Sequence, residues 1–252
     1  MTDILIPGAE AWSHVADGQR GALVLHGFTG NPGSMRGLAE AFAAGGYHVE
    51  MPRLPGHGTT VEDMLTTRWA DWSGAVEAAY QRLAERASSI VVAGLSMGGS
   101  LTLWMAGQHP DIAGLVCVNP ATQPQAPEIV AMLEGMVAEG TTVMPGIGSD
   151  IADPDAKESA YEGTPIPCLL SLVRDGLAVI GPTFPSLHMP LLLLSSPQDH
   201  VVEPVQSDFL AETYGGPVQR ITLERSYHVA TQDYDKDLIF AESVAFADRV
   251  TA

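Results

Sequence analysis

Short apolar runs alternate with helical patterns along the first half of the chain. The runs are almost continuously apolar, as expected of strands covered on both faces, and the segments between them repeat apolar residues with helical periodicity. The predicted strands cover residues 21–27, 47–52, 89–94 and 112–120, and the predicted helices cover residues 34–46, 70–87 and 99–110. This alternation predicts an α/β protein whose parallel sheet is joined by right-handed crossovers.

The alternation stops between Ala121 and His188, where no segment has the pattern of a strand. Residues 127–140 and 164–182 are apolar and helix-like, with a polar, acidic stretch between them. The first of them places a stripe of apolar side chains on one helical face: Ile129, Met132, Leu133, Met136 and Val137. The alternation resumes with strands at 189–196 and 218–224 and helices near 204–215 and 235–250.

A helical insertion thus interrupts an otherwise regular α/β sheet. We predict a core of residues 1–120 and 189–252, with a mostly parallel central sheet flanked by helices, and a helical cap of residues 121–188. Parallel sheets bind ligands at the carboxyl ends of their strands, so an insertion leaving such an end is placed to cover a site. The alternative is an ordinary subdomain that buries its own apolar faces.

The stretch VVAGLSMGG, residues 91–99, contains G-x-S-x-G around Ser96. A predicted strand runs directly into the serine and a predicted helix runs directly out of it. Such a sharp turn strains the serine backbone, and the flanking glycines allow the close backbone approach that it needs. The hydroxyl would then lie at the positive N-terminus of a helix, clear of the sheet. We therefore predict that Ser96 is a nucleophile; a plain glycine-rich turn is the alternative.

A serine hydroxyl needs an adjacent base, and the base needs an acid that orients it. After a serine in a strand-to-helix turn, the acid and the histidine follow in that chain order. Asp199 is the first carboxylate after the strand that follows the insertion, and His228 comes just after the last predicted strand. The predicted triad is Ser96, Asp199 and His228, with Glu203 and Asp208 as weaker alternatives for the acid.

Acyl transfer also needs two preorganised donors for the developing oxyanion. One should be the backbone N–H of Met97, next to the nucleophile, and the other should come from the loop after residues 21–27. In that loop, the N–H of Phe28 is the best candidate. The side chains of Phe28 and Met97 would then also wall the acyl site, which is compatible with Phe28 being a core aromatic.

The charge balance excludes some partners. The chain has 252 residues with a formal net charge of −18, from 12 basic and 30 acidic residues. Nucleic acid is not expected as a partner, because binding phosphates needs a basic footprint. A stable association with an anionic membrane surface is disfavoured for the same reason.

The two cysteines, Cys117 and Cys168, are expected to be free thiols, since a chain of this length needs no disulfide to fold. The first residues lack the pattern of a signal peptide, and no run approaches the roughly 18 apolar residues that a membrane span requires. We therefore expect a cytoplasmic protein. The sequence has no G-x-x-x-x-G-K-[ST] and no H-E-x-x-H or paired C-x-x-C, so neither a cofactor nor a metal is expected.

Several motifs together resemble one family. They are VLHGFTGNPGSMRGLAEAF, RLPGHGT, AGLSMGGSLTLW, PQDHVV, SYHVATQDYD and, inside the insertion, IGSDIADPDAKESAYEGTP. The chain resembles the small bacterial monoacylglycerol lipases and related carboxylesterases of the α/β-hydrolase superfamily. This resemblance implies the triad and oxyanion hole given above. It also implies an apolar tunnel in the cap, with Ile147 over it, and Glu158 as a contact for glycerol hydroxyls.

The resemblance implies hydrolysis of monoacylglycerols to glycerol and free fatty acid through an acyl-enzyme, with at most transient contact with lipid surfaces. The stripe containing Ile129 and Leu133 would line the tunnel for the fatty-acyl chain or pack on the sheet. The alternative within enzymes is a general short- or medium-chain carboxylesterase or an acyl-thioesterase. A non-catalytic ligand receptor on the same fold is the alternative from another class.

Overall fold

A seven-stranded sheet forms the centre of the computed structural model, which describes residues 5–146 and 148–252. Its strand order is β1-β3-β2-β4-β5-β8-β9, and all neighbours are parallel except β1, which is antiparallel to β3. The strands are β1 Trp12–His14, β2 Arg20–Leu25, β3 His48–Met51, β4 Ser89–Leu95, β5 Gly114–Val118, β8 Leu191–Ser195 and β9 Val218–Thr222. The predicted α/β class is confirmed, and β1 is an addition that its short sequence did not reveal.

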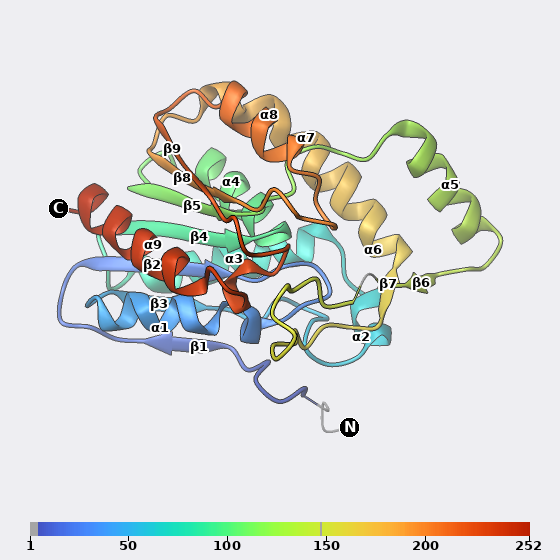
Figure 1. Cartoon of the computed structure of the whole chain (residues 1–252), viewed down its shortest axis with the longest axis horizontal. Coiled ribbons are helices and arrows are strands. Elements are labelled where there is room, and N and C mark those ends of the chain that lie inside the picture. Colours follow the sequence, from blue (N-terminus) through green and yellow to red (C-terminus); the bar gives the residue numbers. More distant parts are fainter. Residues whose placement is uncertain (1–4, 147) are drawn as a thin grey trace.

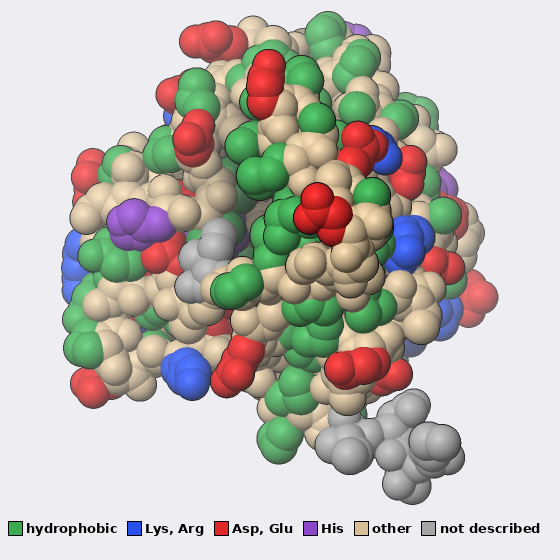
Figure 2. Space-filling model, turned by 90° about the vertical axis from the view of Figure 1, so that its right-hand side faces the viewer, with side chains coloured by type: hydrophobic (Ala, Val, Ile, Leu, Met, Phe, Trp, Pro, Cys, Tyr) green, Lys and Arg blue, Asp and Glu red, His purple; other side chains and the backbone are tan. Residues whose placement is uncertain are grey.

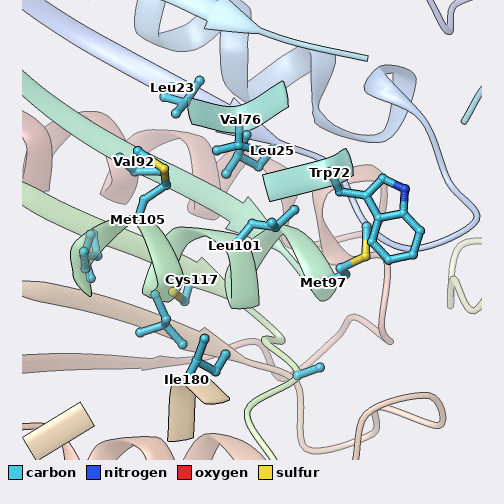
Figure 3. Packing of buried hydrophobic residues seen from close by; sticks show 14 of the residues in the cluster. Leu23, Leu25, Trp72, Val76, Val92, Met97, Leu101, Met105, Cys117 and Ile180 are labelled. Carbon is cyan, nitrogen blue, oxygen red and sulfur yellow. The ribbon is translucent and has the colours of Figure 1, made fainter. Parts of the chain in front are cut away.

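The central strands are apolar throughout because each face of the sheet is covered by helices. Alternate residues of a strand point to opposite faces, so Leu23 and Leu25 of β2 join one core cluster while Ala22 and Val24 join the other. Figure 3 shows the first cluster, where residues of β2 and β4 meet Trp72 and the helix after β4.

Four long helices cover the sheet (Figure 1). On one face lie α3 Trp69–Ala84 and α4 Met97–Gln108, and on the other lie α1 Arg36–Ala44 and α9 Lys236–Val250. The helix α8 Val205–Thr213 packs beside β8, and the short α2 Val61–Leu65 lies in the long connection after β3. The helices predicted for the core are therefore confirmed. The helix α1 begins at Arg36 rather than Ser34, because residues 32–35 form a 3-10 turn capped by Asn31.

The segment between β5 and β8 contains more than helices. It holds α5 Pro127–Ala138, β6 Val143–Pro145, β7 Gly163–Pro165, α6 Ile166–Ser171, a π-helix Leu172–Leu177, α7 Ala178–Ile180 and a 3-10 helix Gly181–Ser186. The expectation of no strand between Ala121 and His188 is wrong, because β6 and β7 pair in an antiparallel ribbon. Each has three residues and contains a proline, so no alternating pattern could show.

The helical run Ile166–Ser186 is 21 residues long and apolar enough, by length and composition, to cross a membrane. The expectation that no run approaches the length of a membrane span therefore needs correction; Arg174 and Asp175 divide this run in the sequence. In the fold it packs on the body of the protein, since Leu172, Leu177 and other residues of the run belong to the main core cluster. Both cysteines are free and buried, as predicted.

The two helical glycines Gly74 and Gly98 should respond oppositely to alanine. A Cβ at Gly74 meets nothing within 4 Å, so Gly74→Ala should stabilise the fold by about 0.5–1 kcal/mol. A Cβ at Gly98 would lie 2.2 Å from the carbonyl oxygen of Leu25, so Gly98→Ala should destabilise it by about 1–3 kcal/mol. Thermal unfolding checks both, and an equal response of the two variants would contradict the packing described here.

Candidate active site

Ser96 occupies the turn between β4 and α4 with φ 58° and ψ −121°, a left-handed conformation that L-residues rarely adopt. The turn is tight on both sides of the serine. A Cβ at Gly94 would lie 2.1 Å from the carbonyl oxygen of Gly98, and a Cβ at Gly98 would lie 2.2 Å from that of Leu25. The glycines of the motif are therefore required by backbone packing, and the strain is concentrated where the predicted nucleophile lies.

Asp199 and His228 form the predicted acid–base pair. Oδ2 of Asp199 accepts a hydrogen bond from Nδ1 of His228 at 2.7 Å, and both side chains are buried. The other oxygen, Oδ1, accepts the N–H groups of Val201 and Val202, each at 2.8 Å. Because the carboxylate accepts, the proton lies on Nδ1 and leaves Nε2 of His228 free to act as a base.

Ser96 and His228 line the same cavity, and Ser96 is 9% exposed. The hydrogen bonds of the described residues include none between the Ser96 hydroxyl and the His228 ring. Such bonds are often long before substrate binds and shorten in the reacting complex. The alternatives for the acid lie elsewhere: Glu203 is exposed, and Asp208 pairs with Arg220 at 2.8 Å.

The loop after β2 carries the predicted second oxyanion donor. No acceptor for the N–H of Phe28 is found among the described residues, and Met97 begins α4, so its N–H has no partner within the helix. Thr29 has φ 60°, and its hydroxyl donates to the carbonyl of Phe28 at 2.6 Å. The Phe28 ring packs edge-on against Trp72, with centroids 5.8 Å apart. The ring is partly buried, packs against the core and lines the cavity.

Two buried histidines support this loop. His26 donates from Nδ1 to the carbonyl of Gly27 at 3.0 Å and accepts the N–H of Leu54 on Nε2 at 3.1 Å, so it joins the loops after β2 and β3. Burial lowers the pKa of His26 to about 4 and that of His57, whose ring lies 5.1 Å from it, to about 3. Both rings are therefore neutral near pH 7 and serve packing and loop geometry.

Glu158 extends from the insertion to the loop after β2. A Cβ at Gly30 would lie 2.7 Å from its Oε1, so the glycine makes room for the carboxyl group. Burial raises the pKa of Glu158 to about 7, although the positive charge of a protonated His228 opposes the shift. The side chain lines the cavity together with Ser96. With a pKa of about 7, this carboxyl group is partly protonated at neutral pH, so it can both donate and accept hydrogen bonds in the cavity that also contains the predicted nucleophile.

The cavity above Ser96 has a volume of about 340 Å³. The stripe on α5 supplies Ile129, Met132 and Leu133 to its lining, while α5 itself packs on α6 and lies apart from the sheet (Figure 1). The interpretation in which this stripe packs on the sheet is therefore wrong. Figure 2 looks onto this side of the molecule, where hydrophobic side chains border a hollow. Ile147, predicted over the tunnel, lies outside the described residues.

Two site residues were missed by the sequence analysis. Asn119, at the end of β5, has φ 44° and donates from Nδ2 to the carbonyl oxygen of His228 at 2.8 Å; it also accepts the N–H of Ser196 at 2.7 Å. Asp150, in the insertion, accepts the N–H of His228 at 3.1 Å. Asparagine tolerates a left-handed backbone, but no local pattern predicts its partners. Within residues 5–146 and 148–252, no cluster of three or more His, Cys, Asp or Glu side chains could hold a metal.

This sheet, with a serine in the strained turn after its central strand β4, defines a serine hydrolase of the α/β-hydrolase class. The model of the family described as serine aminopeptidase, S33, matches residues 19–235, and the chain belongs to that family.

Curated relatives match almost the whole chain. A protein of Bacillus sp. (strain H-257), named thermostable monoacylglycerol lipase, is 44% identical over 96% of this chain and 95% of its own. A carboxylesterase of Bacillus subtilis (strain 168) is 26% identical over 92% and 94%. A solved structure from work on LipS and LipT, two metagenome-derived lipolytic enzymes, has a TM-score of 0.92 and 42% identity, covering 97% of this chain and 99% of that one. The similarity thus extends through the insertion as well as the core.

Glu158→Gln should reduce the pH dependence of stability. The pKa of this carboxyl group rises on folding from 4.5 to about 7, so the native state binds the proton more tightly and loses stability as pH rises through that window. Glutamine cannot ionise. The variant should therefore match the stability of the wild type near pH 4 and exceed it near pH 8, where its free energy of unfolding should be higher by on the order of 3 kcal/mol at most.

Thermal melting across this pH range checks the expectation. Glu162→Gln, at an exposed position of the same segment, is the matched control and should leave the pH dependence unchanged. A constant difference between Glu158→Gln and the wild type at all pH values would contradict the shift.

Proposed function

We propose that the protein hydrolyses monoacylglycerols to glycerol and free fatty acid. The observation that carries the proposal is the joint position of Ser96, the Asp199–His228 pair and Glu158 around one largely apolar cavity. The name of the Bacillus sp. relative supports the substrate class. An apolar chain and a polyhydroxyl leaving group need such a cavity, with apolar walls on one side and a hydrogen-bonding carboxyl group on the other.

In the first step, Ser96 attacks the ester carbonyl while Nε2 of His228 takes the hydroxyl proton. Asp199 holds the ring in the required tautomer and stabilises the imidazolium. The N–H groups of Phe28 and Met97 are proposed to bind the oxyanion, each such donor being worth about 2.7–4 kcal/mol in the transition state. His228 then returns the proton to the departing glycerol oxygen, which leaves an acyl-Ser96 ester.

In the second step, His228 activates a water that attacks the acyl-enzyme in the same oxyanion hole. Collapse of the tetrahedral intermediate frees the fatty acid and returns the proton to Ser96, so the cycle requires no cofactor. We assign the acyl chain to the walls that include Ile129 and Leu133, and the glycerol hydroxyls to Glu158.

We also propose that residues 121–188 act as a cap on a core of residues 1–120 and 189–252. Ile147 belongs to the proposed tunnel by resemblance alone. Contact with lipid surfaces is proposed as transient. A cytoplasmic location suits the two unpaired thiols, because reducing compartments keep cysteines free.

Ser96→Ala should abolish turnover of monoacylglycerols, with kcat lowered by about 10⁶-fold, because the step that forms the acyl-enzyme loses its nucleophile. The wild type should react with one equivalent of a fluorophosphonate probe, and the variant with none. Undiminished labelling of Ser96→Ala would show that Ser96 is not the nucleophile. A pure wild-type protein that neither reacts with the probe nor hydrolyses any ester would favour a ligand receptor instead.

A general carboxylesterase or acyl-thioesterase is the second candidate, favoured by the name of the Bacillus subtilis relative. Glu158→Ala separates the two, because only a glycerol ester uses this carboxyl group in the leaving-group pocket. The ratio of kcat/KM for a monoacylglycerol to that for a p-nitrophenyl ester should fall about tenfold or more, as expected for a lost hydrogen bond to a charged group. Glu162→Ala should leave the ratio unchanged, and an unchanged ratio in Glu158→Ala would favour the general esterase.

A further inference from the structure

One carboxylate of the insertion contacts the backbone of both loops that carry the acid and the base. Oδ2 of Asp150 accepts the N–H of His200, the residue after Asp199, and the N–H of His228, both at 3.1 Å. Oδ1 lies 2.8 Å from Nδ1 of the His200 ring. The carbonyl oxygen of Asp150 accepts the N–H of Val229 at 3.0 Å. Asp150 therefore joins three parts of the chain that the sequence keeps far apart.

These contacts are shielded from solvent. The Asp150 side chain is 11% exposed, whereas the His200 side chain beside it is 58% exposed. Hydrogen bonds from N–H groups to a carboxylate are stronger than those between neutral groups, and low exposure weakens the competition from water. The two backbone contacts of Asp150, rather than its ion pair with the exposed His200 ring, are thus the contacts suited to fixing geometry.

The peptide groups on both sides of His228 are held. Its N–H donates to Asp150 and its carbonyl oxygen accepts from Asn119, while its ring donates to Asp199. Loops are ordinarily the mobile parts of a fold, and this loop is anchored at the residue whose ring must stay aligned. With the backbone fixed on both sides, the direction of Nε2 depends only on the side-chain torsions.

The segment that carries Asp150 is itself held by hydrogen bonds. The N–H groups of Ala152 and Asp153 donate to the carboxylate of Asp233, at 2.7 and 3.0 Å, so the segment is attached to the core next to the His228 loop. Among the described residues, by contrast, the carboxylate of Asp153 accepts only the N–H of Asp155, within the same segment. Asp150 and Asp153 thus differ in their contacts while sharing charge and location.

We propose that Asp150 is a positioning residue that keeps the loops of Asp199 and His228 in register, so that the insertion helps to assemble the triad as well as covering the cavity. The proposal rests on the proposed function, in which His228 is the base. Displacement of a reacting group by about 1 Å can cost about 100-fold in rate. Loss of Asp150 should therefore act on kcat.

The test compares Asp150→Ala and Asp150→Asn with the matched control Asp153→Asn, using a p-nitrophenyl ester. Asp150→Ala should lower kcat about 10- to 100-fold with unchanged KM. Asp150→Asn should lose less, because an amide oxygen still accepts both N–H groups. Asp153→Asn, which removes one charge from the same segment, should leave kcat unchanged.

A spectroscopic readout separates positioning from mere stability. The low-field proton resonance of the His228 Nδ1–H, measured by NMR well below the unfolding temperature, should weaken or disappear in Asp150→Ala and persist in Asp153→Asn. In Asp150→Asn, which preserves the shape of the side chain, the resonance should shift. If Asp150→Ala does not fold, unchanged kcat and an unshifted resonance in Asp150→Asn overturn the proposal.

His228→Ala distinguishes failure of this inference from failure of the proposed function. If His228→Ala is inactive while Asp150→Ala keeps wild-type kcat and resonance, the positioning role is wrong and the proposed function stands. An equal loss of kcat in Asp150→Asn and Asp153→Asn would mean that net charge is responsible, which also overturns the inference. Full turnover by His228→Ala would overturn the proposed function itself.

Discussion

The close approach of backbone at Gly94 and Gly98 is the constraint on which the rest of the site depends. With no side chain at either position, the end of β4 can turn directly into α4, and α4 can lie against the carbonyl of Leu25. This contact forces Ser96 into its left-handed conformation and places it at the positive end of a helix. It also brings the loop after β2, with Phe28, beside the serine, so that the same backbone packing positions both the predicted nucleophile and the proposed oxyanion donors.

Around this rigid centre, the remaining groups are supplied by loops that hydrogen bonds hold in place. Among the residues that the structure describes, the non-glycine residues with positive φ are Thr29, Ser96 and Asn119, and all of them follow the carboxyl ends of central strands. Such strain persists only where neighbouring structure determines it: backbone packing at the flanking glycines does so at Ser96, and buried side-chain hydrogen bonds do so at Asn119. Asn119 and Asp150 hold the peptide groups on the two sides of His228, which couples the sheet and the insertion at one residue.

Different parts of the insertion contact the rest of the protein in different ways. The segment containing Asp150 and Glu158 is fixed to the core by hydrogen bonds, including that from the N–H of Tyr161 to the carbonyl of Thr29 at 3.1 Å. Among the described elements, the helix α5 packs chiefly on α6. Its Met132 side chain remains more than half exposed. Hydrogen bonds are directional and suit the polar side of the cavity, whereas the apolar wall needs only shape and burial. The two parts of the insertion thus suit the two ends of the proposed amphiphilic substrate.

The sequence by itself determined the α/β class, the nearly complete order of its elements and the turn at Ser96, because these depend on local periodicity and on glycines whose effect is local. It also indicated Asp199 and His228 by chain order, although no residue near either one specifies the other. Only the tertiary structure decided what surrounds them. The pairing of β6 with β7 and the hydrogen bonds of Asn119 and Asp150 to His228 all join residues distant in the chain. Short segments with no regular pattern carry no signal of such partners.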